Sequence, residues 1–331
     1  MSPRRLLIAL FACLAALPIR AERVAVAYPG PLNISYLPLD LIPKIGADRA
    51  EGVEFVPRPT GGGGAALQQL QSRNVDFAVA GVPAAMSAKA AGNDVAVIAA
   101  VDDLAVFVLT VRSDLKDKVR QPRDLAGRVI GVTSSSLSVK TISHQLAELL
   151  LRNDGLSPNQ VRIVAAGQSW EEQSAAMRSK SVDAILGFEP FASRLRDAGL
   201  AFFLFNLGNP ADAARVPGGG LLQAAAITRS DILRDAPRKA EKMVAVIRRT
   251  LQWIASHTPE EVVAALEIDD AETRHSLLKS LRQYPRLYSP DGKLSDRQMR
   301  ETALFYAANE GTARPVPIET IVDPRWAGRK P

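Results

Sequence analysis

Four hydroxyl side chains occur in succession at residues 133–136, in the stretch Thr-Ser-Ser-Ser. They follow the apolar run 129–132 and precede a segment with helical periodicity, so they occupy a strand-to-helix junction. Hydroxyl groups at such a junction can cap the first amides of the helix. With those amides, they can also donate hydrogen bonds to a negatively polarised ligand group. The stretch therefore predicts either a simple cap or part of a binding site.

Other expected strand ends carry small or polar residues as well. These are Thr60–Gly64, Gly81–Pro83, Gln168–Trp170 and Gly187–Phe191. Taken singly, each is explained as a helix cap or a solvated loop, although four consecutive glycines are costly for a cap alone. In open α/β sheets, ligands bind outside the carboxyl ends of the strands. The combination therefore indicates a ligand site built from several loops.

The familiar catalytic patterns do not account for these loops. No Gly-x-Ser-x-Gly elbow occurs, and the histidines at 144, 257 and 275 fall in helical segments, so a Ser-His-acid hydrolase is disfavoured. The same scattered histidines fit no metal-ligand spacing. The glycine run at 61–64 lacks the lysine of a P-loop and the spacing of a dinucleotide fingerprint. We expect no cofactor and no catalytic residue.

The elements that must position these loops alternate between strand and helix. Apolar runs predict strands at residues 23–28, 53–57, 75–80, 95–101, 105–112, 128–133, 161–165, 182–187, 201–205 and 221–228. Helical periodicity covers 136–151, where Val139, Ile142, Leu146, Leu149 and Leu150 share a face, and also 170–179 and 237–256. Capping boxes begin at Ser169, Thr258 and Ser295.

Strand–helix alternation predicts parallel α/β sheets. The expected strands stop near residue 228, and the last hundred residues are almost entirely helical. The length suggests two domains, yet no linker divides the chain into two sequential parts. We therefore expect two lobes that share strands.

The N-terminus has the order of a secretory signal peptide. Arg4 and Arg5 precede an apolar stretch of 12 residues, Leu6–Leu17, and Ala21 offers a small-residue cleavage site. The stretch is short for a membrane span, which needs about 20 residues. Lipid attachment through Cys13 is the minor alternative. Cleavage after Ala21 predicts an exported, periplasmic chain.

Removal of this segment leaves no cysteine and lowers the net charge from +6 to +3, because it carries three arginines and no acid. The mature chain is therefore expected to have neither disulfides nor thiolate metal sites. The remaining Lys and Arg residues are interspersed with acids, so nucleic-acid binding has no electrostatic basis.

Several stretches resemble one family, the periplasmic solute-binding proteins of ABC importers in the sulfonate/taurine/nitrate and thiamine-precursor (NMT1/THI5-like) branch. The similar stretches are AALQQLQSRNVDFAVAGVPAAMSAKAAGNDVAVIAA, DLAGRVIGVTSSSLSV, MRSKSVDAILGFEPFASRL and PVPIETIVDPRWA. Two positions depart from the family pattern, Asn74 in the first stretch and Phe188, where a Trp is usual, in the third.

The resemblance implies the type II periplasmic-binding-protein fold, two α/β lobes joined by two crossing strands near 105–112 and 221–228, with a ligand cleft between them. It implies lobe 1 at 22–108 and 225–331, lobe 2 at 109–224, and a signal peptide at 1–21. It also implies these ligand-facing residues: Tyr28, Asn33, Gly62, Gly63, Gly81, Val82, Pro83, Ser134, Ser135, Ser136, Gln168, Phe188 and Glu189.

The function implied is capture of a small organic solute for an ABC importer, by a monomer that delivers it to a cognate permease. The expected ligand is a sulfonate, an organic acid, a nitrate-like anion or a pyrimidine-like heteroaromatic. Two alternatives remain open at this point, a periplasmic ligand-sensing module and a pyrimidine-synthase-like enzyme of the same fold. The enzyme would need a histidine in the cleft, and no strand-end loop carries one.

Overall fold

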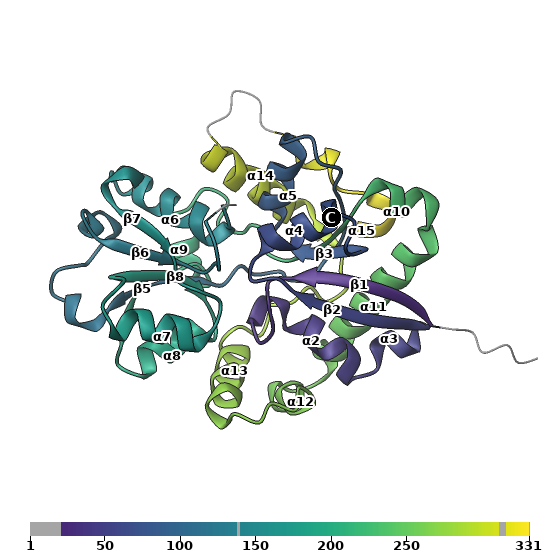
Figure 1. Ribbon diagram of the computed structural model, residues 1–331, viewed down its shortest axis with the longest axis horizontal. Coiled ribbons are helices and arrows are strands. Elements are labelled where there is room, and N and C mark those ends of the chain that lie inside the picture. The colour runs from purple at the N-terminus through teal and green to yellow at the C-terminus, as the bar shows by residue number, and fades with distance from the viewer. Residues whose placement is uncertain (1–20, 138–139, 311–315, 331) are drawn as a thin grey trace, which may run out of the picture.

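The computed structural model describes residues 21–137, 140–310 and 316–330, which form two α/β lobes lying side by side (Figure 1). Nearly all of the expected signal peptide, including Cys13, lies outside the described residues. Each lobe is built on one five-stranded sheet.

The lobe 1 sheet has the strand order β2-β1-β3-β10-β4. Strands β1, β2 and β3 are parallel, whereas β10 is antiparallel to both of its neighbours. The bounds are β1 Glu22–Tyr28, β2 Val53–Pro59, β3 Phe77–Ala80, β4 Ala96–Ala100 and β10 Ala225–Thr228. β4 is buried along its whole length, as its unbroken apolar sequence predicts for a strand covered on both faces.

The lobe 2 sheet repeats this plan with the order β7-β6-β8-β5-β9. Its inserted antiparallel strand is β5, which pairs with β8 and β9. The bounds are β5 Phe107–Arg112, β6 Val129–Val132, β7 Arg162–Ala165, β8 Ala184–Phe188 and β9 Ala201–Asn206. A short parallel pair, β11 Leu294–Ser295 and β12 Arg329–Lys330, lies apart from both sheets.

Helices pack on both faces of each sheet (Figure 1). In the first lobe they are α2 Leu37–Lys44, α3 Ala47–Ala50, α4 Gly63–Gln71, α5 Val82–Ala90, α10 Ser230–Asp235, α11 Pro237–Ser256, α12 Pro259–Ala265, α13 Ala271–Gln283, α14 Asp296–Glu310 and α15 Pro324–Ala327. In the second lobe they are α6 Ile142–Asn153, α7 Trp170–Arg178, α8 Phe191–Asp197 and α9 Pro210–Ala213. Short 3-10 turns occur at Ile34–Tyr36, Ser113–Leu115, Pro122–Leu125, Pro158–Gln160 and Ile318–Thr320.

The chain passes between the sheets twice, at residues 101–106 after β4 and at 207–224 after β9. The two passages lie side by side, since the amide of Val101 donates to the carbonyl of Ala224 (2.9 Å) and the amide of Ala224 donates to Asp102 Oδ1 (3.0 Å). Gln223 joins them again by accepting from the amide of Val106 (3.1 Å). The paired crossings form the only covalent connection between the two sheets in the described chain, and we call them the hinge.

The crossings correct two expectations. The sheets are mixed rather than parallel, because β10 and β5 each enter a sheet after the chain has crossed from the other lobe. The crossings themselves are loops beside the strands expected at 105–112 and 221–228, and those strands lie within one sheet each. The lobe boundaries at 108/109 and 224/225 stay a proposal.

The ten strands expected from apolar runs are all present, with ends that differ by up to four residues. The helix expected at 136–151 instead begins at Ile142, after Thr141, whose side chain accepts from the amide of His144. The expected face residue Val139 lies outside the described residues. The capping boxes at Ser169, Thr258 and Ser295 all form.

Candidate ligand-binding site between the lobes

A cavity of about 40 Å³ lies between the lobes, and we call it the inner cavity. Lobe 1, the hinge and the loops of lobe 2 all contribute to its wall. The lining residues are Pro29, Asn33, Tyr36, Gly63, Gly64, Gly81, Ala84, Phe107, Thr133, Thr141, Ile142, Ser143, Gln168, Phe188 and Gln223. None of these described lining residues is an acid, a basic side chain or a cysteine.

Three helices begin at the wall of this cavity. Gly62 and Gly81 precede α4 and α5 in lobe 1, and Thr141 precedes α6 in lobe 2. Gly63 and Gly64 of α4, Ile142 of α6 and Ala84 of α5 line the cavity. Each helix N-terminus carries a partial positive charge, although the first amides of α5 already donate to the carbonyls of Leu222 and Gly81. Their convergence gives a site without a cationic side chain a positive potential, which favours a negatively polarised ligand atom.

Asn33 adds a directional donor to this potential. Its Oδ1 accepts from the amide of Ser35 (3.1 Å), which fixes the side chain on the 3-10 turn that follows. Its Nδ2 is buried and has no hydrogen-bond partner among the described residues. Because a buried amide group without a partner costs about 1–3 kcal/mol, this donor indicates a position where a ligand oxygen would accept.

Of the hydroxyl run, only Thr133 lines the inner cavity, and the hydroxyls of Thr133 and Ser134 are bonded to backbone carbonyls. Thr133 Oγ1 donates to the carbonyl of Leu186 (3.1 Å), and Ser134 Oγ donates to the carbonyl of Ser136 (2.5 Å). Ser135 and Ser136 are exposed. The amide of Ser135 donates to the carbonyl of Gly61 in the opposite lobe (3.2 Å). The run therefore acts as a turn and as a contact between the lobes.

Glycines allow the lobes to approach closely here. A Cβ added at Gly81 would lie 2.1 Å from Cδ1 of Ile142, and one added at Gly61 would lie 2.5 Å from Ser135 Oγ. Gln168 Nε2 spans the same gap to donate to the carbonyl of Gly61 (2.9 Å). The inner cavity of about 40 Å³ is much smaller than the 300–1,000 Å³ that is usual for ligand cavities. The described arrangement is therefore a closed one in which Ile142 fills part of the cleft.

The predicted ligand-facing residues divide into two groups. Asn33, Gly63, Gly81, Gln168 and Phe188 line the inner cavity. The others do not line it: Tyr28, Gly62, Val82, Pro83, Ser134, Ser135, Ser136 and Glu189.

Glu189 is the clearest departure from the predicted site. Its carboxylate is fully buried and accepts from the amide (3.0 Å) and the hydroxyl (2.9 Å) of Ser193, one turn further along the chain. Burial raises the pKa of this carboxyl group, while the two donors from Ser193 oppose the rise. Its backbone carbonyl accepts from the amide of Ile34 in lobe 1 (3.3 Å). Glu189 therefore organises the start of α8 and a contact between the lobes, and its role as a ligand contact stays a prediction.

Tyr28 supports the site from behind. Its hydroxyl donates to Asp40 Oδ1 (2.8 Å), and the other carboxylate oxygen of Asp40 accepts from the amide of Leu32 (2.9 Å). The two bonds hold the loop that carries Pro29 and leads to Asn33. Burial raises the pKa of Asp40 from 3.8 to about 6, although both donors oppose the rise.

Among the lining residues that sequence reasoning missed, four come from elements without any polar loop signature: Tyr36, Phe107, Ile142 and Gln223. Gln223 is buried in the hinge, where its Nε2 donates to Ser35 Oγ (2.7 Å). A glutamine inside the apolar run 221–228 was the one available signal, since a buried amide must find partners. The other three lie in apolar segments that read as ordinary core. Ala84, Thr141 and Ser143 were missed as well.

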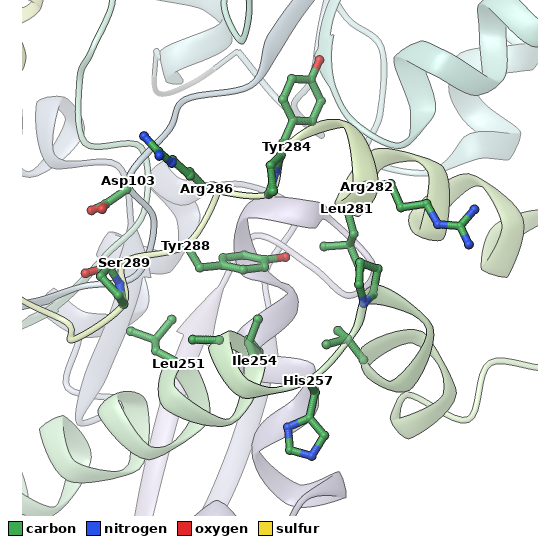
Figure 2. A pocket seen from close by; sticks show the side chains of 15 residues that line it. Asp103, Leu251, Ile254, His257, Leu281, Arg282, Tyr284, Arg286, Tyr288 and Ser289 are labelled. Atoms are coloured by element: carbon green, nitrogen blue, oxygen red, sulfur yellow. The ribbon is translucent and has the colours of Figure 1, made fainter.

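A second cavity, of about 660 Å³, lies in lobe 1 away from the cleft, among α11, α12, α13 and the segment that follows α13 (Figure 2). Tyr288 lies across it, His257 lies at one end, and Asp103 and Arg286 lie at the other. Its wall shares no residue with that of the inner cavity.

Within the described residues, no helix is long and apolar enough to cross a membrane. The same residues contain no cluster of three or more His, Cys, Asp or Glu side chains arranged to hold a metal ion.

Comparison with solved structures identifies the class of fold. The chain is similar to a protein from Bordetella bronchiseptica RB50, with a TM-score of 0.80, 21% identity, and coverage of 94% of this chain and 95% of that one. It is also similar to the alkanesulfonate-binding protein SsuA from Xanthomonas axonopodis pv. citri bound to MOPS, with a TM-score of 0.70, 19% identity, and coverage of 96% and 100%. A variant of DszB in complex with biphenyl-2-sulfinic acid matches with a TM-score of 0.56, 16% identity, and coverage of 94% and 97%.

Two lobes with mixed five-stranded sheets and a double hinge are the periplasmic-binding-protein fold. The profile of the NMT1/THI5-like family matches residues 49–262, which is more than half of the chain. The chain belongs to the NMT1/THI5-like family. A search of curated protein sequences found no significant match.

Proposed function

We propose that this protein is the solute-binding component of an ABC importer and that it traps a small organic solute in the inner cavity by closure of its two lobes. The observation that carries the proposal is the buried Nδ2 of Asn33, a donor without a partner at a cavity where three helices begin. Such a site recognises a ligand oxygen that bears negative charge.

The expected ligand is a small molecule with a carboxylate, sulfonate or similar oxygen-rich group. The similarity to SsuA, an alkanesulfonate-binding protein, supports this class. A sugar is disfavoured, because sugar sites need many side-chain donors and acceptors, and the described lining of the inner cavity has one buried side-chain donor without a partner.

The location and partner follow from the same proposal. Export to the periplasm is supported by the signal-like order of residues 1–21. The partner is a cognate permease, and the protein acts as a monomer. A sensory partner in place of the permease is compatible with the same cleft. Co-purification with permease subunits would support the permease as the partner and distinguish it from a sensory partner.

The enzymatic alternative has one supporting observation, the shared fold of DszB. Catalysis by acid–base or nucleophilic chemistry needs an activated group at the ligand. The described lining of the inner cavity supplies amide and hydroxyl side chains without an acid, histidine or lysine to activate them. Binding without chemistry is therefore the function that we propose.

A thermal-shift screen of purified protein tests the proposal with carboxylates, sulfonates, nitrate, pyrimidines and sugars. A ligand at 100 times its Kd should stabilise the protein by about 2.7 kcal/mol. The variant Ile254→Trp narrows the cavity of Figure 2, so a ligand of the cleft should stabilise this variant as it does the wild type. A stabilising ligand that Ile254→Trp abolishes, or the absence of any stabilising acid, contradicts the proposal.

A further inference from the structure

A larger cavity continues from the inner cavity toward solvent, and we call it the outer cavity. Its volume is about 410 Å³, and it shares Pro29, Asn33 and Gln168 with the inner cavity. Asn33, whose Nδ2 lacks a partner, therefore lies at the junction of the two. A molecule bound to this donor has space on both sides of it.

The outer cavity has an apolar part with a wall in each lobe. Lobe 1 contributes three prolines, Pro29, Pro31 and Pro59, and lobe 2 contributes Trp170 and Phe191. Proline rings and aromatic rings present flat surfaces that lose little side-chain entropy when a ligand packs on them. Pro29 and Pro31 of the segment after β1 thus gain a role in the wall of the cleft.

The charge of the one arginine in this wall is already compensated. Arg194 lies over the ring of Trp170, with its Cζ 4.2 Å from the ring centroid. Its guanidinium donates to Glu272 Oε2 (2.9 Å) and Thr273 Oγ1 (3.1 Å) of α13. Two acids, Glu171 and Glu172, also line the outer cavity, and Glu172 accepts from the amides of Gln168 and Ser169. The outer cavity therefore offers apolar surface and no unpaired cation, so an acidic head group is assigned to the inner cavity.

The volumes assign different parts of a ligand to the two cavities. A water molecule needs about 10–15 Å³ of cavity volume. The inner cavity of about 40 Å³ therefore has room for a head group of roughly three heavy atoms. The outer cavity of about 410 Å³ is within the usual range for whole ligands. A head group alone would leave the larger, apolar part of the site unused.

We propose that the ligand is an elongated organic acid, with its carboxylate or sulfonate in the inner cavity and a flat hydrocarbon ring in the outer cavity between the prolines and Trp170. The inference rests on the proposed function, because it assumes that the cleft binds a solute. It goes further by assigning the ring-binding surface to Pro29, Pro31, Pro59, Trp170 and Phe191.

The inner cavity has a second neighbour, a groove of about 350 Å³ between α4 and α5 that shares Gly64 and Ala84 with it. This groove has no aromatic residue in its described lining. Its one cation, Lys140, is paired with Glu148 (2.8 Å). Asn33 does not line it. The ring is therefore assigned to the outer cavity, and this groove supplies the control.

Calorimetric titration tests the assignment with probes that share a head group: acetate against 3-phenylpropionate, and methanesulfonate against benzenesulfonate. We expect the ring-bearing probes to bind wild-type protein at least ten-fold more tightly. Trp170→Ala should remove that ten-fold advantage and leave the ringless probes unchanged. Trp170 also packs against buried side chains, so Glu171→Trp serves as a second variant. It places a ring in the outer cavity from an exposed position, and that ring should exclude the ring of a probe and weaken the binding of the ring-bearing probes.

The control is Ala88→Trp, which fills the groove between α4 and α5 and should leave all four affinities unchanged. Loss of the ring-bearing probes in Ala88→Trp, with retention in Trp170→Ala and Glu171→Trp, would overturn the assignment. Equal affinity of wild-type protein for probes with and without a ring would also overturn it, and the proposed function would stand. If the wild type binds none of the four, both this inference and the proposed acid-binding function are contradicted.

Discussion

Asn33 concentrates the recognition chemistry of the site in one side chain. Its oxygen is used within lobe 1, where it accepts from Ser35, and its nitrogen is left for a ligand. The two polar atoms of Asn33 therefore have separate partners. A substitution can replace the nitrogen while the oxygen keeps its hydrogen bond from the amide of Ser35. Residue-scale tests can therefore separate binding from folding.

Asn33→Asp should weaken ligand binding without a comparable loss of stability. The aspartate keeps an oxygen for the amide of Ser35, but it replaces the free donor with a charged acceptor that repels an anionic head group. We expect a loss of roughly 1–3 kcal/mol in binding free energy, measured by titration with an acid found in the thermal-shift screen.

The matched control is Asn74→Asp, which makes the same charge change at an exposed position outside both cavities. Equal weakening in the control would mean that net charge, and not Asn33, determines the effect. Unchanged binding in Asn33→Asp would remove Asn33 from the site.

Asp40 gives the protein a pH dependence of known sign. Burial raises its pKa from 3.8 to about 6, so the folded protein holds the proton more tightly than the unfolded chain. This contribution to stability is fully present below pH 3.8 and is lost as the pH rises to about 6. Between these values, the wild type should lose about 2–3 kcal/mol relative to Asp40→Asn, which does not titrate.

Urea unfolding of both proteins at pH 3.5, 5 and 7 measures this difference. The exposed substitution Asp117→Asn is the control and should run parallel to the wild type at every pH. A difference between wild type and Asp40→Asn that is constant across the range would show that Asp40 has an ordinary pKa.

At the scale of elements, the hydroxyl run and the start of α6 have separate tasks. The run ends in two exposed serines, of which Ser135 contacts the opposite lobe, and the helix is capped five residues after the run by Thr141. Thr141 and Ser143 line the inner cavity, while Ser135 and Ser136 do not. The part of this segment that reaches the inner cavity as a helix N-terminus is therefore the one at Ile142.

Paired substitutions distinguish these tasks. The double variant Ser135→Ala with Ser136→Ala should change the binding free energy by less than about 0.5 kcal/mol, because exposed substitutions outside the cavity lining have small effects. Thr141→Ala removes the cap on the amide of His144 and should lower the free energy of unfolding by about 1 kcal/mol. Affinity that falls ten-fold in the serine double variant would restore the hydroxyls as ligand donors.

The comparison of sequence with structure follows the same division. The strands and the capping boxes could be predicted, because each depends on the types of a few neighbouring residues: an unbroken apolar run for a buried strand and a Ser or Thr three residues before a Glu or Gln for a capping box. The start of α6 was wrong, since apolar spacing continues through 136–141 and only the cap geometry of Thr141 marks the boundary. The antiparallel entry of β5 and β10 depends on which lobe the chain has just left, and local sequence carries no record of that.

The lining of the inner cavity could be predicted only in part, and which of its residues bind a ligand stays a prediction. Asn33, Gly63 and Gln168 lie in or next to the loops at strand ends, and they line the cavity. Ile142 and Gln223 reach the cavity from a helix and from the hinge, where an apolar or isolated polar residue has no distinguishing pattern. Which side chains face each other across two lobes is decided by closure, and therefore by the whole molecule.

At that largest scale, the closed arrangement is held by polar contacts at both sides of the hinge. α13 of lobe 1 approaches α8 of lobe 2, where Arg194 donates to Glu272 and Thr273, and Lys279 pairs with Asp197 (2.5 Å). On the loop side, the carbonyl of Gly61 accepts from Ser135 and Gln168. Exposed ion pairs contribute little each, so the geometry of the loops decides whether the lobes can meet.

Gly61 is the position at which closure is most directly tested. Its φ is +74°, and a Cβ there would lie 2.5 Å from Ser135 Oγ of the other lobe, so Gly61→Leu should hold the lobes apart. Gly92 has a φ of +85° and nothing within 4 Å of an added Cβ, which makes Gly92→Leu a control for backbone strain without a contact between lobes. Both variants should lose about 1–2 kcal/mol of stability from the left-handed conformation.

The two variants should differ in binding and shape. When the binding-competent state is populated less, the apparent Kd rises by the same factor. With saturating ligand, small-angle scattering should show a decrease in radius of gyration for the wild type and for Gly92→Leu, and a smaller decrease or none for Gly61→Leu. Its apparent Kd should rise at least ten-fold, while that of Gly92→Leu stays unchanged. A Gly61→Leu variant that closes and binds as the wild type does would show that the contact between Gly61 and Ser135 is incidental to ligand capture.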